Sequence, residues 1–333
     1  MADIKTISKY VFFILISLPI CWIGLSFLGF TETEIEKDKD FENEFIKNYA
    51  IYAIEIPEKL DFAGDNIPLN NFDVFESVDR EFLVNVYWQS QTLLFIKRAN
   101  KYFPIIEKIL KENDVPDDFK YLAVAESGLT NVVSPAGATG FWQFMKPAAI
   151  EYGLEVNNDI DERYNLEKST VAACKYFRAS YKKYQNWSLV AASYNMGTGG
   201  LDSQISTQCV SDYHDLLLNT ETGRYLYRIV AIKTILSNPE KYGFHFRDKD
   251  LYQNIPVDRI RIDTTIDNLV EFSHNININY KVLKIFNPWL RKSYLPNKSN
   301  KEYFINIPKK GYRDFKPTIE ASIDSLIIDT IQN

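Results

Sequence analysis

Apolar residues recur at three- and four-residue steps through the middle of this 333-residue chain. The clearest runs are Leu83, Val86, Leu93 and Ile96; Phe103, Ile106, Ile109 and Leu110; Leu166, Thr170, Cys174, Phe177 and Tyr181; and Tyr225, Ile229, Ile232 and Leu236. This spacing puts an apolar stripe on one side of a helix, which turns once in about 3.6 residues. Little of the region alternates with the period of a strand. We therefore predict a predominantly α-helical domain over residues 79–245.

The N-terminus carries the pattern of a membrane anchor. Lys5 and Lys9 precede residues 11–30, twenty positions without a charge. About 20 apolar residues suffice to cross a bilayer, and no cleavage site of small residues follows. Residues 1–30 are therefore predicted to be an uncleaved signal anchor. The basic flank favours a cytoplasmic N-terminus and places the rest of the chain outside the cytoplasm.

Cys21 leaves a second mode of anchoring open. Leu18, Pro19, Ile20 and Cys21 loosely resemble a lipoprotein box, in which the cysteine carries the lipid. The apolar run continues for nine residues past Cys21, where a lipid-modified protein would turn polar. The transmembrane anchor is the favoured interpretation.

Residues 31–78 are predicted to be an acidic tether followed by an irregular arm. Positions 32–44 hold seven carboxylates and two lysines. Such a run repels itself and stays solvated. Prolines and asparagines then interrupt residues 57–78, which favours an arm without regular structure lying along the next domain.

A glutamate stands at the end of an apolar helical pattern. Pro116 and the two aspartates after it favour a helix start, and the pattern ends at Glu126. A carboxyl group beside apolar surroundings is costly to ionise, so its protonated form persists towards neutral pH. Glu126 is therefore a candidate general acid for cleavage of a sugar bond. The alternative is a solvated carboxylate of the kind common at helix ends.

Five ordered blocks across about a hundred residues carry a family resemblance. They are residues 125–128 with 134–138, then 140–145, 161–163, 191–197 and 221–225. Together they resemble the lytic transglycosylases with a lysozyme-like (SLT) catalytic domain, and within these the membrane-bound murein transglycosylase D type. The resemblance covers approximately residues 103–236. It implies a lysozyme-like helical fold, in agreement with the periodicity.

The resemblance also implies a reaction. In that family a single glutamate, matched here by Glu126, protonates the oxygen of the β-1,4 bond between N-acetylmuramic acid and N-acetylglucosamine. The same group then removes the proton of the muramyl C6 hydroxyl, and a 1,6-anhydro ring closes without water. Glycoside hydrolysis ordinarily needs two carboxylates. The acidic residues at 159, 161, 162 and 167 leave a second carboxylate open, although their spacing is more typical of loop and helix-start charges.

Six further positions match substrate-binding or orienting residues of the family. Ser127 is expected to bond near the acid or to a sugar acetamido group, and the alternative is that it caps a helix. The others are Gln143, Met145, Tyr194, Asn195 and Tyr225. Tyr225 matches a tyrosine that the family places near the acid. Gly137 and Gly140 would let backbone approach the ligand. For each aromatic residue and glycine, packing or turn geometry is the alternative.

The C-terminal region predicts a small α+β module. Residues 258–263 and 303–308 have strand patterns, and residues 266–272 and 280–286 have the pattern of short helices. This order resembles a LysM wall-binding module over residues 251–316, followed by a tail at 317–333. The module holds twelve basic and six acidic residues, whereas the whole chain has a net charge of −6. A basic module suits an anionic polymer such as peptidoglycan; a solvated face is the alternative.

Cysteine and histidine usage predicts neither a metal site nor a cofactor. The chain has three cysteines and three histidines, with no CxxC motif and no cluster of both. Cys174 and Cys209 are the only pair outside the anchor. A bridge between them stays open, although a buried thiol at Cys174 is favoured.

The expected protein is thus a membrane-anchored peptidoglycan lytic transglycosylase of the cell envelope, with its catalytic domain on the periplasmic side. No nucleic-acid motif accompanies the basic charge, so nucleic acid is not an expected partner. Two other classes remain open. A lysozyme-type hydrolase would use the same Glu126 and add water, and a non-catalytic wall-binding protein would lack a usable acid.

Overall fold

The computed structural model describes residues 39–40, 43 and 51–313. The described residues from Ile54 onward belong to one compact unit, which contains everything described below. The predicted anchor at 1–30 and the tail at 317–333 lie outside the described residues, as does most of the acidic run. Within the described part, none of the helices combines the length and the apolar character needed to cross a bilayer.

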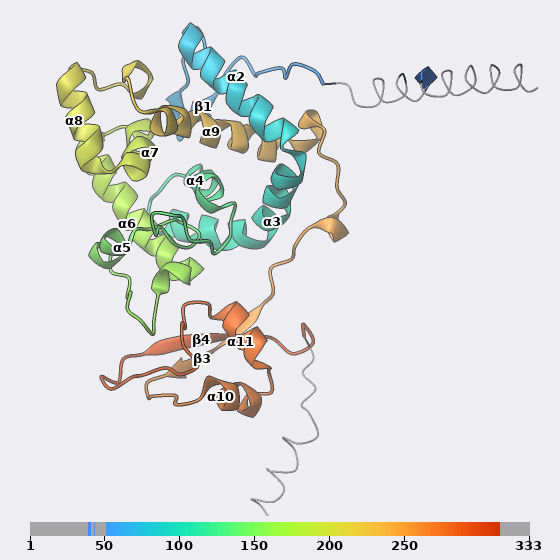
Figure 1. Cartoon of the computed structure of the whole chain (residues 1–333), viewed down its shortest axis with the longest axis vertical. Coiled ribbons are helices and arrows are strands. Elements are labelled where there is room, and N and C mark those ends of the chain that lie inside the picture. The colour runs from blue at the N-terminus through green and yellow to red at the C-terminus, as the bar shows by residue number, and fades with distance from the viewer. Residues whose placement is uncertain (1–38, 41–42, 44–50, 314–333) are drawn as a thin grey trace, which may run out of the picture. The chain divides into compact units, whose positions relative to one another are not determined.

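The larger part of this unit is helical, as the periodicity predicts (Figure 1). A two-stranded hairpin of β1 (Asp61–Phe62) and β2 (Asp65–Asn66) precedes the helices. The helices are α2 (Phe72–Tyr87), α3 (Gln89–Glu112), α4 (Phe119–Ser127), α5 (Lys146–Glu151), α6 (Leu166–Tyr184), α7 (Trp187–Met196), α8 (Thr198–Gln208) and α9 (Thr220–Ser237). Short 3-10 turns lie at Glu162–Tyr164, Tyr213–Asp215, Pro239–Tyr242 and Asp248–Asp250.

Helix α6 shows how local sequence sets these elements. The Asn165 side chain accepts a hydrogen bond from the backbone N–H of Lys168, which satisfies a free donor of the first turn. Cys174 and Phe177 then lie on its buried face. The helix ends where Gln185 adopts a left-handed conformation, with φ of 51°. Cap, apolar stripe and stop signal are all local, which is why the sequence pattern located this helix.

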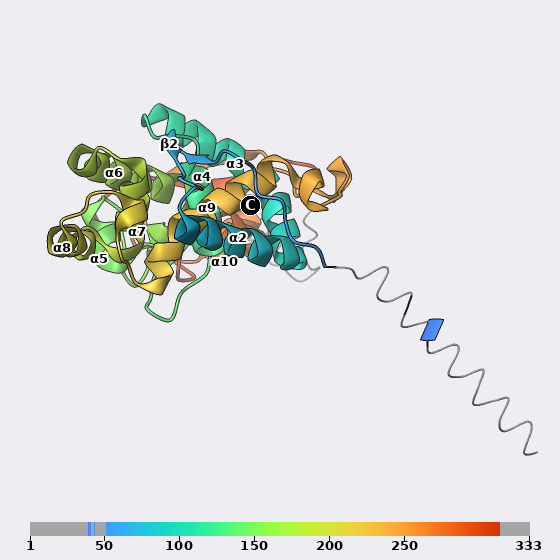
Figure 2. The ribbon, with the colours of Figure 1, turned by 90° about the horizontal axis from the view of Figure 1, so that it is seen from above.

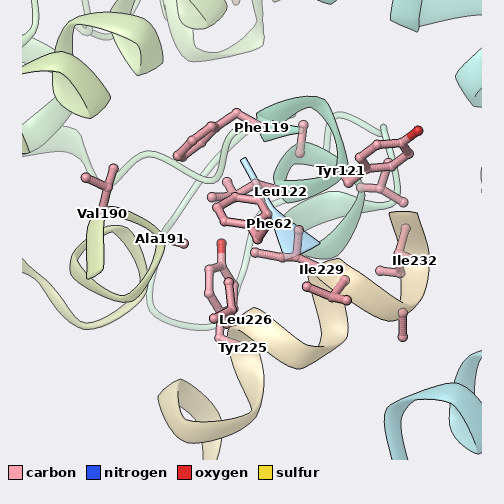
Figure 3. Close-up of a cluster of buried hydrophobic side chains, with 14 of the residues drawn as sticks. Phe62, Phe119, Tyr121, Leu122, Val190, Ala191, Tyr225, Leu226, Ile229 and Ile232 are labelled. Atoms are coloured by element: carbon pink, nitrogen blue, oxygen red, sulfur yellow. The ribbon is translucent and has the colours of Figure 1, made fainter. Parts of the chain in front are cut away.

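Helix α4 lies at the centre of the domain and packs against α3 and α9 (Figure 1). Helix α9 also runs beside α2, as both ribbon views show (Figures 1 and 2). Figure 3 shows the cluster of side chains between α4, α9 and the β-hairpin, with Phe62 and Leu122 at its centre. Both side chains are fully buried, and burial of each contributes about 1.5–3 kcal/mol. The helix that carries Glu126 is therefore fixed on several sides.

The expectation of an irregular arm over residues 57–78 is wrong in two places. Residues 61–66 form the β-hairpin, and α2 begins at Phe72 rather than near residue 79. Phe62, Ile67 and Val74 are buried in the main core. These apolar side chains are too few and too irregularly spaced to predict a helix or a strand. Their burial nevertheless packs the segment into the core.

Helix α4 starts at Phe119, three residues later than Pro116 suggested. The Asp118 side chain makes no cap bond. Its carboxylate instead accepts the backbone N–H of Ala63 at 2.6 Å and pairs with Lys233 at 2.7 Å. The Asp118 side chain therefore bonds to Ala63 and Lys233, which are distant in the sequence, and does not cap the helix.

The C-terminal module has the predicted order of strand, helix, helix and strand. Its elements are β3 (Val257–Ile262), α10 (Leu269–Asn275), α11 (Tyr280–Phe286) and β4 (Tyr303–Pro308). The strands pair antiparallel, from Val257 opposite Pro308 to Ile262 opposite Tyr303. Leu269, Leu283, Leu290 and Ile305 form a separate small core in the module. Elsewhere in the unit, Cys174 is a buried free thiol and Cys209 an exposed one, so no bridge joins them.

Candidate active site

Glu126 lies in the last turn of α4, whose preceding residues 119–124 are all buried. Gly128 ends the helix in the left-handed region, with φ of 59°, and its N–H bonds to the Val124 carbonyl at 2.8 Å. A Cβ on Gly128 would lie 2.7 Å from a ring carbon of Phe95. Only glycine fits this close approach and this backbone conformation without strain. The helix therefore ends at Ser127, one residue after the glutamate.

The Glu126 carboxyl group has an environment that favours its neutral form. Burial raises its pKa to about 7, and the negative charge of Glu221 acts in the same direction. A hydrogen bond from the Tyr225 hydroxyl to Oε1 of Glu126 and the charge of Arg228 oppose this rise. Desolvation is the largest effect, so a substantial fraction of Glu126 is protonated at neutral pH.

Helix α9 supplies the phenol that contacts the acid. Asn219 caps this helix by accepting the N–H groups of Glu221 and Thr222 at 3.0 Å. Tyr225 follows one turn later and is 2% exposed, and Figure 3 shows its ring pointing from α9 into the cluster beside α4. Burial and the nearby Glu126 hold the pKa of Tyr225 well above its usual range. The phenol therefore stays protonated and acts as a hydrogen-bond donor.

Ser127 ties the end of α4 to the loop before α5. Its hydroxyl lies 2.8 Å from the carbonyl oxygen of Phe141 and 3.2 Å from that of Ala123. A hydroxyl has one proton, so these two carbonyl oxygens share it. The structure thus shows Ser127 bonded to its own chain beside the acid.

The loop at residues 137–145 is shaped by unusual backbone conformations. Gln143 has φ of 49°, and its side-chain amide donates to the carbonyl oxygens of Gly140 at 2.7 Å and Val132 at 3.1 Å. The Met145 side chain follows and is 45% exposed. Of these two predicted contact residues, Met145 is the more exposed, whereas the Gln143 side chain holds the loop.

The expectation that Gly140 admits a ligand is corrected by its surroundings. A Cβ on Gly140 would lie 2.0 Å from the carbonyl oxygen of Arg163. The absence of a side chain at Gly140 therefore leaves room for this backbone carbonyl. At Gly137, by contrast, no atom lies within 4 Å of where a Cβ would be. The Arg163 guanidinium donates to the carbonyl oxygens of Gly137 at 3.1 Å and Phe144 at 3.2 Å. Arg163 thus fixes both ends of the loop.

Tyr194 and Asn195, at the end of α7, connect the loop to α9. The Tyr194 hydroxyl donates to the carbonyl oxygen of Trp142 at 2.6 Å. Asn195 accepts a hydrogen bond from the Thr222 hydroxyl at 2.8 Å. Burial, with Glu126 nearby, keeps the pKa of Tyr194 well above its usual range. The matched blocks therefore meet around Glu126, although five of the six supporting side chains, all but Met145, bond to protein groups.

Each acidic residue considered earlier as a second catalytic carboxylate has a partner. Asp161 forms a buried ion pair with Arg163 at 2.7 Å, and Asp159 accepts from the Tyr294 hydroxyl at 3.1 Å. Glu162 pairs with Lys168, and Glu167 with Arg259. Two of these contacts, Asp159 with Tyr294 and Glu167 with Arg259, reach the C-terminal module, and the other two are local.

Sequence analysis missed two charged residues that act on the acid. Glu221 is exposed at the start of α9, and Arg228 lies one turn beyond Tyr225. Both alter the pKa of Glu126, in opposite directions. Their spacing of four and three residues from Tyr225 was the available signal. In the described part of the chain, no group of three or more His, Cys, Asp or Glu side chains could hold a metal ion.

Comparisons with known proteins agree with this geometry. Residues 103–215 match the transglycosylase SLT domain family, and residues 258–311 match the soluble lytic transglycosylase C-terminal LysM-like domain family. The chain thus combines an SLT domain with a LysM-like domain.

Individual relatives give the same picture. The chain is 27% identical over 278 residues to the membrane-bound lytic murein transglycosylase D of Escherichia coli K12, and equally to that of Escherichia coli O6:H1. The match covers 81% of this chain and 60% of each relative. This chain therefore spans about three fifths of the length of these relatives.

Proposed function

We propose that this protein is a peptidoglycan lytic transglycosylase in which Glu126 is the single acid and base. The observation that carries the proposal is the placement of Glu126 at the end of a buried helix, bonded to Tyr225, with its pKa raised to about 7. A group with this pKa can give up and take back a proton near neutral pH. The SLT domain match and the name of the murein-cleaving relatives support this choice of reaction.

The proposed reaction has two proton transfers. Neutral Glu126 first gives its proton to the oxygen between C1 of N-acetylmuramic acid and N-acetylglucosamine, and the C1–oxygen bond breaks with help from the muramyl acetamido group. The resulting Glu126 carboxylate then takes the proton of the muramyl C6 hydroxyl, whose oxygen bonds to C1. The products are a free N-acetylglucosamine end and a 1,6-anhydromuramyl end. Glu126 regains its proton, and no water is consumed.

The other matched residues are proposed to shape and line the groove. Met145 would touch a sugar directly, because its side chain is 45% exposed. Tyr225 would orient the Glu126 carboxyl group. Ser127, Gln143, Tyr194 and Asn195 would act through the bonds that hold the surrounding loop and helices.

Glu221 supports a second candidate, a lysozyme-type hydrolase. It is an exposed carboxylate whose charge raises the pKa of Glu126. Hydrolysis needs a second carboxylate to activate water or to stabilise the sugar cation. Glu221 is the residue that would take this role.

Mass spectrometry of the muropeptides released from purified peptidoglycan tests both candidates. The full chain in detergent is expected to release 1,6-anhydromuramyl products, and Glu126→Gln to reduce their rate by about 10²–10⁴-fold, the range for loss of a general acid. Glu221→Gln serves as the matched control and is expected to retain anhydro products. Reducing-end products that disappear in Glu221→Gln would establish the hydrolase. If neither the unchanged chain nor any variant released muropeptides, the protein would be a wall-binding protein without catalytic activity.

We also propose that residues 1–30 anchor the protein in a membrane with its SLT domain in the periplasm. The relatives are named membrane-bound, and residues 11–30 carry no charge. The full chain and Cys21→Ala are both expected to stay with membranes after extraction at high pH. Release of Cys21→Ala alone would indicate that a lipid on this cysteine is the anchor.

A further inference from the structure

Residues 159–163 of the SLT domain are bonded to the C-terminal module. The backbone N–H of Asp161 donates to the carbonyl oxygen of Trp289 at 2.9 Å, and Ile160 forms an antiparallel β-bridge with Leu290. The Ile160 side chain is 2% exposed and belongs to the core of the module. A movement of this segment would therefore break a backbone bond and open the module core.

The same segment is bonded to the loop at residues 137–145. The Asp161 carboxylate binds the Arg163 guanidinium through both of its oxygens, at 2.9 Å and 2.7 Å. A guanidinium held by two parallel bonds has a fixed orientation. Arg163 then donates to the carbonyl oxygens of Gly137 and Phe144, at the two ends of the loop. Asp161 thus sets the direction in which Arg163 holds the loop.

The loop in turn is bonded to α4 and α7. The carbonyl oxygen of Phe141 accepts the hydroxyl of Ser127, the residue after Glu126, at 2.8 Å. The carbonyl oxygen of Trp142 accepts the Tyr194 hydroxyl at 2.6 Å. Tyr194 is close enough to Glu126 for the charge of the glutamate to raise the pKa of the phenol. A continuous series of bonds therefore runs from the module to the surroundings of the acid.

The ion pair in the middle of this series is the step most sensitive to change. The side chains of Asp161 and Arg163 are each 10% exposed. Removal of one charge from such a buried pair leaves the other without compensation, so the arginine must find new partners. A displacement of about 1 Å that starts far from the reacting atoms can lower a rate by about 100-fold. A change at Asp161 is therefore expected to reach the acid through the loop.

We propose that the C-terminal module holds the loop at residues 137–145 in place through Ile160 and Asp161, and that Asp161 is a positioning residue for the reaction at Glu126. The effect on the reaction rests on the proposed function, whereas the link between module and loop does not. Every bond in the series lies within the chain. This role of the module is therefore independent of any glycan bound to it.

Methyl NMR of the full chain in detergent, without glycan, tests the link. The chain has three methionines, so the Met145 methyl signal can be assigned from its loss in Met145→Leu. Asp161→Asn removes the charge that orients Arg163 and is expected to shift the Met145 signal. The Met196 methyl carbon lies 3.4 Å from the position of a Cβ on Gly200 of α8, and its signal is the internal reference. An unmoved Met145 signal in Asp161→Asn overturns the proposal.

Glu167→Gln is the matched control for Asp161→Asn. Glu167 also pairs with an arginine, Arg259 of the module, but lies outside the series of bonds that leads to the loop. The Met145 signal is expected to keep its position in this variant. An equal shift in both variants would show that the loop responds to any loss of charge at the junction, which overturns the specific role of Asp161.

A change inside the module tests the other end of the series. Leu290→Val removes one carbon at the bridge to Ile160 and is expected to shift the Met145 signal as well. Val270→Ala, at a 39% exposed position of α10, is the control and should leave the signal in place. A shift in Asp161→Asn without one in Leu290→Val would confine the support to the SLT domain and overturn the role of the module.

The consequence for the reaction is measured as kcat for anhydro products. Asp161→Asn is expected to lower kcat by about tenfold or more, and Glu167→Gln to leave it within about twofold. A shifted Met145 signal with an unchanged kcat would overturn the positioning role of Asp161. If the unchanged chain releases no anhydro products, the proposed function fails, and the NMR result still decides the link between module and loop.

Discussion

Two glutamates contact residues of α9, and the difference between their partners separates a carboxylate in an ion-pair network from one whose pKa is raised. Glu81 of α2 is 1% exposed and lies 2.6 Å from Arg80, 2.8 Å from Arg224 and 3.6 Å from Arg228. Glu126 of α4 receives a hydrogen bond from the uncharged phenol of Tyr225. Positive partners stabilise a buried anion, whereas a phenol offers a hydrogen bond without a charge.

The comparison shows how one helix serves both roles. Arg224 and Arg228 act on Glu81, and Tyr225 acts on Glu126. Desolvation therefore dominates at Glu126 and raises its pKa to about 7. Adjacent positions of α9 thus fix a buried ion-pair network and orient an acid that can be protonated.

The largest expected effect is on the free energy of unfolding and comes from removing the Glu81 carboxylate. Glu81→Ala leaves Arg224 and Arg228 without their buried partner, and loss of one member of such a pair costs about 3–5 kcal/mol. Urea unfolding of the full chain in detergent measures this loss. Glu221→Ala, an exposed carboxylate on α9, is the control and should change stability by less than about 0.5 kcal/mol. Equal stability of the two variants would contradict a structural role for Glu81.

Glu126→Gln should change stability in the opposite direction. The folded-state pKa of Glu126 is raised from 4.5 to about 7, so folding takes up a proton between these values and the unfolding free energy falls as pH rises through them. The variant lacks this cost and should be more stable than the unchanged chain above pH 7, by up to about 3 kcal/mol. Urea unfolding at pH 5 and pH 8 measures the difference. A stability difference that is the same at both pH values would show that the raised pKa is wrong.

Tyr225→Phe should have a smaller effect and act on the pH profile. The Tyr225 hydrogen bond lowers the pKa of Glu126, so its loss raises that pKa. The acid form then persists to higher pH, and the alkaline fall in kcat shifts upwards. We expect kcat near pH 6 to fall about tenfold, or ~1.4 kcal/mol, because the carboxyl group is less well oriented. If kcat fell but the alkaline limb of its pH profile did not move, Tyr225 would contribute packing and would not act on the pKa of Glu126.

The smallest expected effects come from the two charges missed by sequence analysis. Arg228 lowers the pKa of Glu126 and Glu221 raises it. Arg228→Gln should therefore move the alkaline limb of kcat upwards, and Glu221→Gln should move it downwards. Shifts of the same sign in both variants would contradict the electrostatic assignment.

Local patterns were sufficient to predict the elements that depend on nearby residues. The stripe through Cys174 and Phe177 became the buried face of α6, and residues 280–286 and 303–308 became α11 and β4 with the same limits. The hairpin around Phe62 was not predictable in this way. Its two-residue strands carry no clear period, and its position depends on packing with distant helices.

The sequence by itself determined the helical class, the order of elements in the module and the candidate acid, because helix and strand periods, caps and ordered motifs are local properties of the chain. Tertiary structure alone decided what surrounds that acid. Tyr225 lies 99 positions from Glu126, the carbonyl of Arg163 explains Gly140, and Ile160 belongs to a core whose other buried residues begin at Leu269. Such contacts arise from packing between distant segments, and the desolvation that raises the pKa of Glu126 exists only once they form.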